Sequence, residues 1–114
     1  MQLLSSSGRP YDFAAAGNTQ TYADMATAAG LKEIATYADV VGAHKDLVIP
    51  VKDGALGTPT ALVKDAHALN LAVHIWTLRP ENAFLPAAYK KAPTTDNTVR
   101  GDSVGEIQVF LKAG

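Results

Sequence analysis

The chain has 114 residues, and its 10 Lys and Arg residues nearly balance its 11 Asp and Glu residues, for a formal net charge of −1. Its basic residues form no stripe that could follow a nucleic-acid backbone, and no apolar run approaches the roughly 20 residues of a membrane helix. The absence of cysteine excludes disulfides and thiolate metal sites. These properties predict one small domain without nucleic-acid or membrane partners, too short for a complete eight-stranded βα barrel of roughly 250 residues.

The first half of the sequence predicts a strand, a helix and a weak second strand. The apolar run QLLS at 2–5 ends in a loop and is typical of a short buried strand. Apolar residues at helical spacing predict a helix at about 28–38. The run LVIPV at 47–51 predicts a weak strand or an extended crossing segment, because Pro50 confines it to an edge. His44 is expected in a solvated loop before that run.

The second half is more clearly marked. Thr58 as N-cap and Pro59 at the first helical position predict a helix at about 59–69. The run LAVHIWTL at 71–78 is apolar on both faces, which is typical of a strand covered on both sides of a parallel sheet. Residues 83–102 contain two prolines and many small polar residues, which indicate a long surface loop.

Two further signals lie near the C-terminus. Within the long loop, one helical turn is expected at about 87–90. Ser103 and Glu106 have the spacing of a capping box and predict a final helix, which Gly114 would end at the C′ position.

The order of these elements is that of βα units with parallel strands. It predicts an α/β fold with about three helices and two to three short parallel strands. The first strand has no helix before it, and the last helix has no strand after it. We therefore expect residues 1–114 to form a single incomplete domain.

The segment ALVKDAHALNLAVHIWTLRPENAFLP resembles glycerophosphodiester phosphodiesterases, which have a helix ending in Ala-His, a strand closing on Trp-Thr, and then Arg and Glu-Asn. QLLSSSGRPYDF and RGDSVGEIQVFLKAG are similar to the flanking pieces of the periplasmic, longer-looped branch. The resemblance implies the C-terminal part of a TIM barrel, possessing the sixth strand at 2–5 and the seventh at 72–77. The first five strands and the eighth would be absent, and the remaining elements could repack or swap between copies.

The complete enzymes of this family hydrolyse glycerophosphodiesters to glycerol 3-phosphate and an alcohol. The resemblance implies a catalytic histidine and a divalent cation, Ca²⁺ or Mg²⁺, both held on strands that this chain lacks. It therefore implies no cofactor in this chain and little or no activity of the chain alone. Members of this branch are often periplasmic or secreted, but the start of the chain lacks a signal-peptide pattern, so its localisation stays open.

The resemblance also implies three substrate-binding residues. Trp76 would form a wall against the glycerol moiety, Arg79 would meet a phosphate oxygen with its planar fork, and Glu81 follows with Asn82 in the same loop. The alternative for Trp76 is a core aromatic residue. For Arg79 and Glu81 the alternative is an ordinary salt-bridged or solvated turn, which the residues themselves favour.

His74 alternates with Trp76 on one face of the expected strand, so His74 and Arg79 are the weak catalytic candidates. A buried histidine satisfied by a neighbour is the favoured alternative for His74. His67 follows Asp65 by two residues on a helix, so the two side chains do not share a face and cannot easily bind one metal. We expect His67 to bond a backbone carbonyl at the helix end.

Uncovered strand edges and apolar sheet faces favour association. They predict a homo-oligomer or domain-swapped assembly. Two alternatives to a phosphodiesterase fragment follow: a non-catalytic self-associating module, and a metal-independent hydrolytic site that His74 and Arg79 would form between copies.

Overall fold

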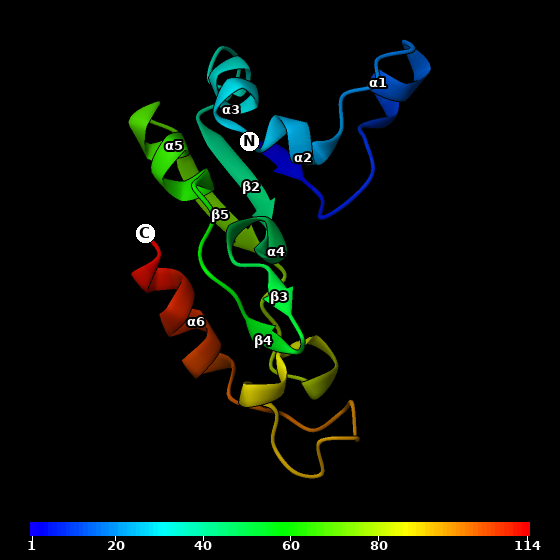
Figure 1. Ribbon diagram of the computed structural model, residues 1–114, viewed down its shortest axis with the longest axis vertical. Helices are drawn as coiled ribbons and strands as arrows, with labels where there is room; N and C mark the ends of the chain where they lie inside the picture. The colour runs from blue at the N-terminus through cyan, green and yellow to red at the C-terminus, as the bar shows by residue number, and fades with distance from the viewer.

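The computed structural model describes all 114 residues (Figure 1). A three-stranded parallel sheet, in the order β1-β2-β5, forms its centre. Its strands are β1 (Gln2–Leu4), β2 (Val40–His44) and β5 (Ala72–Trp76). A separate antiparallel pair consists of β3 (Val51–Lys52) and β4 (Ala55–Leu56). The α/β class with parallel strands is confirmed, and the sheet does not close into a barrel.

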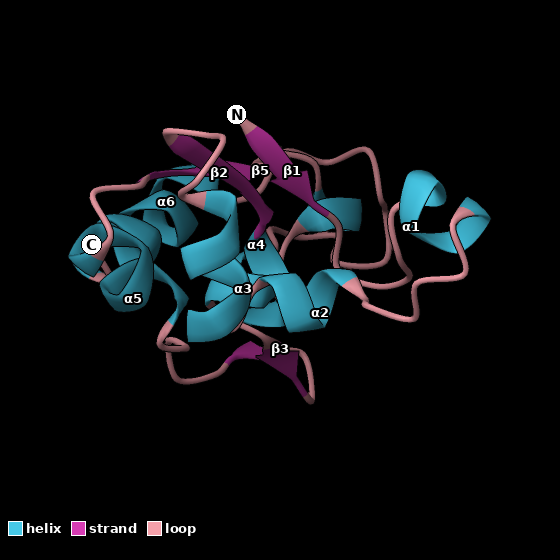
Figure 2. Cartoon of the chain, turned by 90° about the horizontal axis from the view of Figure 1, so that it is seen from above, coloured by secondary structure: helices cyan, strands magenta, loops and turns pink.

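Six helices and two 3₁₀ turns accompany the strands, against about three helices expected. The helices are α1 (Tyr11–Ala15), α2 (Tyr22–Met25), α3 (Ala28–Ile34), α4 (Lys45–Val48), α5 (Leu62–Ala68) and α6 (Ser103–Lys112), and the 3₁₀ turns are Asn82–Phe84 and Ala87–Tyr89. Seen from above, the sheet lies along one side of the molecule, with α2, α3, α4 and α5 below it (Figure 2). No helix is both long and apolar enough to cross a bilayer.

The sheet is therefore covered on one face only. Leu4, Val41 and Ala43 point toward the helices and are completely buried in the main apolar cluster. Leu3 points to the other face and is 57% exposed, even though it pairs with the central strand opposite Gly42. Side chains of the open face lie where no second layer covers them.

The strand expected at 47–51 is not formed over that range, because residues 47–48 lie in helix α4 and only Val51 lies in a strand, β3. The central strand of the parallel sheet is β2. Val48 is the last residue of the short helix α4, Ile49 follows it, and both are buried. The sequence of β2 has only a weak strand signal, because it contains Gly42 and Ala43. Small residues suit the middle of this sheet, since the side chains of Met1 and Leu3 lie where a Cβ at position 42 would be.

Strand β5 is correctly placed within 71–78, but the expectation that both its faces are covered is wrong. It is an edge strand of the sheet, and Ala72 and His74 on its open face are exposed. The apolar run therefore predicts the strand correctly, but it does not predict the position of that strand at an edge of the sheet. The expected buried histidine at position 74 is wrong for the same reason.

Helix boundaries were the least well predicted. Helix α3 ends at Ile34, and α5 begins at Leu62, where the Thr60 hydroxyl rather than Thr58 accepts the Leu62 N–H. At α6, the Asp102 carboxylate accepts the Gly105 N–H, so the expected capping box is wrong and Glu106 is buried instead. The strand within 2–5, the turn within 87–90 and the positive φ of Gly114 after α6 are confirmed.

Candidate functional site

An aromatic pair stands at the carboxyl ends of two neighbouring strands. His44 ends β2, Trp76 ends β5, and the parallel register places the two residues side by side. Their rings meet edge to face with centroids 5.0 Å apart. The Trp76 indole Nε1–H donates to the Gly42 carbonyl at 2.8 Å. Both contacts fix the indole orientation, and half-buried Trp76 is not a core residue.

His44 is held by contacts with Asp46 and with Trp76, which the sequence did not predict. The backbone N–H of Asp46 donates to His44 Nδ1 at 3.3 Å, and an oxygen of the Asp46 carboxylate lies 3.7 Å from that nitrogen. Because Nδ1 accepts the hydrogen bond from Asp46, a neutral His44 ring carries its own proton on Nε2. The expected solvated loop is wrong, because the side chain is only 24% exposed. Recognition of VVGAH as the central strand would have placed His44 beside Trp76.

Arg79 and Glu81 form an ion pair in the loop after β5. Arg79 Nη2 donates to Glu81 Oε1 at 2.7 Å, and Nε donates to Oε2 at 3.2 Å. The guanidinium also stacks over the Phe84 ring, with its Cζ 4.3 Å from the centroid. Hydrogen bonds from Arg79 lower the pKa of Glu81, and the bond to Glu81 raises the pKa of Arg79. Both shifts favour the charged forms of the two side chains, and the remaining guanidinium N–H groups make no hydrogen bond.

The other candidates are placed apart from these groups. His74 lies on the open sheet face with no hydrogen-bond partner, and no hydrogen bond or ring contact joins it or Trp76 to Arg79. His67 is exposed on α5, and the expected bond to a carbonyl is not formed. Asn82 is completely buried, and its side-chain amide bonds to the backbone of the 91–96 loop, which makes it a structural residue.

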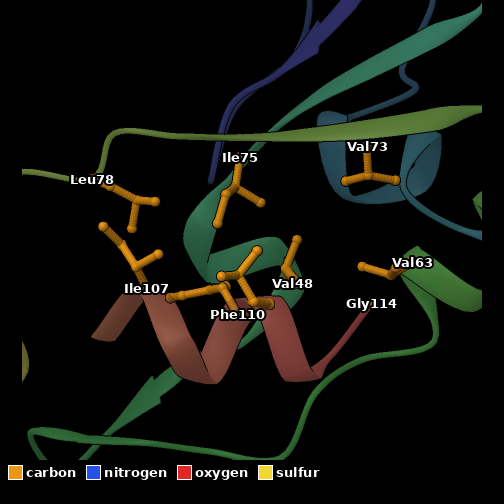
Figure 3. Close-up of a pocket in the computed structure, with 9 residues that line it drawn as sticks. Val48, Val63, Val73, Ile75, Leu78, Ile107, Phe110 and Gly114 are labelled. Atoms are coloured by element: carbon orange, nitrogen blue, oxygen red, sulfur yellow. The ribbon is translucent and has the colours of Figure 1, made fainter. Parts of the chain in front are cut away.

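An apolar cavity of about 190 Å³ lies on the opposite side of the sheet, between β5 and α6. Figure 3 shows Ile75 of β5 pointing toward Phe110 of α6, and Val73 of the same strand facing Val63 and Gly114. These strand residues alternate with His74 and Trp76, so the strand itself separates the cavity from the aromatic pair. The cavity does not belong to the candidate site.

Comparison with known proteins shows a similarity over part of this chain. Over 74 residues, the chain is 42% identical to a glycerophosphodiester phosphodiesterase of Arabidopsis thaliana. The chain resembles a segment of a glycerophosphodiester phosphodiesterase. The match covers 65% of this chain and 20% of the length of the Arabidopsis protein. No family model matches the chain, and no solved structure matches it.

The resemblance implies that a complete glycerophosphodiester phosphodiesterase holds a divalent cation. Ca²⁺ and Mg²⁺ bind through several oxygen ligands, chiefly carboxylates. Nowhere in this chain do three or more His, Asp or Glu side chains come together as metal ligands would. The residues present therefore do not fit such an ion.

Proposed function

We propose that the chain forms the substrate-facing part of a glycerophosphodiester phosphodiesterase, with Trp76 as the wall against the glycerol moiety. The observation that carries this proposal is the His44–Trp76 pair at the carboxyl ends of β2 and β5. Ligands of βα proteins bind at that end of the parallel strands. A fixed indole offers a flat apolar wall for the carbon atoms of glycerol.

In this proposal Arg79 meets the phosphate and Glu81 orients Arg79. Two guanidinium N–H groups bond to Glu81, and the others remain available to phosphate oxygens. The ion pair holds the fork in one orientation, which reduces the entropy lost when a phosphate binds. Because Glu81 is anionic, the proposal gives it no direct contact with the phosphate.

Hydrolysis needs more than this wall and fork. Water must attack phosphorus while the leaving alcohol takes up a proton, and positioned acids and bases typically contribute about 10²–10⁴-fold to such steps. His74 is the one candidate on the open face, and no neighbouring side chain orients it. The proposal therefore gives the chain substrate binding, with slow or no turnover on its own.

Binding can be tested with the single tryptophan, because its fluorescence reports on position 76 alone. We expect glycerol 3-phosphate to change the emission saturably, and Arg79→Gln to weaken that binding about tenfold or more, since charged hydrogen bonds are lost. Arg9→Gln is the matched control, because Arg9 is exposed on the loop before α1 and only reaches the Asn18 carbonyl. Equal affinities for the two variants would contradict the role of Arg79.

Turnover is tested separately with glycerophosphocholine, with Ca²⁺ or Mg²⁺ added and then removed by a chelator. No turnover is expected under either condition. Metal-dependent turnover that is lost in Trp76→Ala would contradict the expected inactivity. Metal-independent turnover that is lost in His74→Ala would favour a hydrolytic site built between copies.

Self-association is a second candidate function, and the surface area of the chain favours it. The molecule exposes 6759 Å², whereas a compact monomer of this mass exposes about 6,000 Å². The excess of about 800 Å² is close to the share of one partner in a standard protein interface. The open sheet face, with exposed Met1 and Leu3, is the surface that a second copy would cover.

A further inference from the structure

One buried ammonium group joins three distant parts of the chain. Lys45, the first residue after β2, donates from Nζ to Glu106 Oε1 of α6 and to the Phe84 carbonyl of the 82–84 turn, both at 2.6 Å. The Lys45 and Glu106 side chains are 9% and 0% exposed. A buried ion pair has no great advantage in stability over apolar residues of similar size, so its presence calls for a more specific account.

The contact with Phe84 leads directly to the candidate phosphate-binding residue. Phe84 is 43% exposed, and its ring carries the Arg79 guanidinium on one face. The backbone of the same residue accepts the Lys45 hydrogen bond. Lys45 therefore fixes the carbonyl of Phe84, the residue whose ring contacts Arg79, while Glu81 binds the Arg79 guanidinium directly.

We propose that Lys45, held by Glu106, is a positioning residue that sets the place of the Arg79 guanidinium and thereby its affinity for phosphate. The effect on phosphate rests on the proposed function, in which Arg79 meets that group. The simpler reading is that the ion pair only holds α6 against the end of β2. The two readings differ in what happens at Arg79 when the pair is removed without loss of the fold.

The double variant Lys45→Met/Glu106→Leu makes this distinction. It removes one positive and one negative charge, so the net charge is unchanged, and it leaves no unpaired buried charge. The Phe84 carbonyl loses its donor. Lys90→Met is the matched control, because Lys90 lines the same surface hollow as Lys45 but its side chain makes no hydrogen bond or ion pair.

Three measurements are made on each protein: urea unfolding, the NMR signal of the Arg79 Nε–H, and the affinity for glycerol 3-phosphate from Trp76 fluorescence. The double variant is expected to unfold cooperatively, to shift the Arg79 signal as the guanidinium leaves the Phe84 ring, and to bind glycerol 3-phosphate about tenfold more weakly. The Lys90→Met variant is expected to match the unsubstituted chain in the Arg79 signal and in affinity.

An unchanged Arg79 signal and affinity in a folded double variant would overturn the proposal. If the double variant does not fold, Phe84→Ala replaces it, since this exposed ring can be removed with little loss of packing. Weaker binding in Phe84→Ala supports the route through Phe84, and unchanged binding overturns it. If the unsubstituted chain binds no glycerol 3-phosphate, the proposed function fails, and the Arg79 signal alone decides whether Lys45 positions that residue.

Discussion

Arg79 has a structural role in its loop, and the proposed function adds a role in recognition. Its fork is held by Glu81 and its flat face rests on Phe84, yet it is about half exposed. Of the two predicted kinds of turn, the salt-bridged one is confirmed. The phosphate contact stays a prediction. An ion pair at such an exposed position adds little to stability. Its main effect is on the orientation of the guanidinium.

The charge of Glu81 leads to a prediction on pH. Hydrogen bonds from Arg79 lower its pKa in the folded chain, so the pair stabilises the fold above the usual glutamate range. This contribution is lost as the pH falls through the lowered value. An NMR titration of the Glu81 side-chain carboxyl should have its midpoint below the usual range, and Arg79→Gln should move that midpoint upward. An identical midpoint in both proteins would contradict the pairing.

Among the secondary-structure elements, α2 and α3 pack so closely that α3 has a glycine, Gly30, where it contacts α2. A Cβ at Gly30 would lie 2.5 Å from the Asp24 carbonyl oxygen and from the Met25 Cα. Both neighbours are backbone atoms and cannot move aside as the end of a side chain can.

Two effects compete when Gly30 is replaced by alanine. Helix propensity favours alanine over glycine by about 0.5–1 kcal/mol. Overpacking against backbone typically costs about 1–3 kcal/mol, so we expect Gly30→Ala to lower the free energy of unfolding in urea. Ala29→Gly, at an exposed neighbouring position of α3, is the control and should cost only the propensity difference. A more stable Gly30→Ala variant would mean that the two helices can separate without penalty.

The same elements indicate how far the sequence alone can lead. Helix α5 can be predicted from the sequence, because Leu62, Val63 and Ala66 bury one face at helical spacing. Strand β2 was missed because Gly42 and Ala43 carry no apolar signal, and His44 was lost from the site with it. Periodicity along the chain also contains no information on which strand lies at the edge of a sheet, so the exposure of His74 was not predicted.

At the scale of the whole molecule, the shape is elongated and the core is small. The radius of gyration is 15.3 Å, whereas a compact domain of this length has about 13 Å. Helix α1 projects from the rest, and one sheet face has no cover (Figure 1, Figure 2). Closure by a second layer, whether from a second copy or from additional chain, would bury this face.

We expect the isolated chain to associate through the open sheet face. Sedimentation equilibrium should give at least twice the 12.0 kDa mass of the monomer at micromolar concentration. Leu3→Lys places a charge on that face and should shift the equilibrium toward the monomer. Val104→Lys, at an exposed apolar position on α6, serves as the control and should leave the mass unchanged. A monomer at every concentration would exclude this association.

The buried pair between Lys45 and Glu106 has a consequence for how the gene can change. The two codons lie 61 positions apart, yet neither can lose its charge alone without leaving the other charge buried and unpaired. One oxygen of Glu106 already lacks a hydrogen-bond partner, so the loss of the bond to Lys45 would leave both carboxylate oxygens unpaired. Evolution at these two positions is therefore coupled, and a route to apolar residues at both must pass through an intermediate that folds poorly.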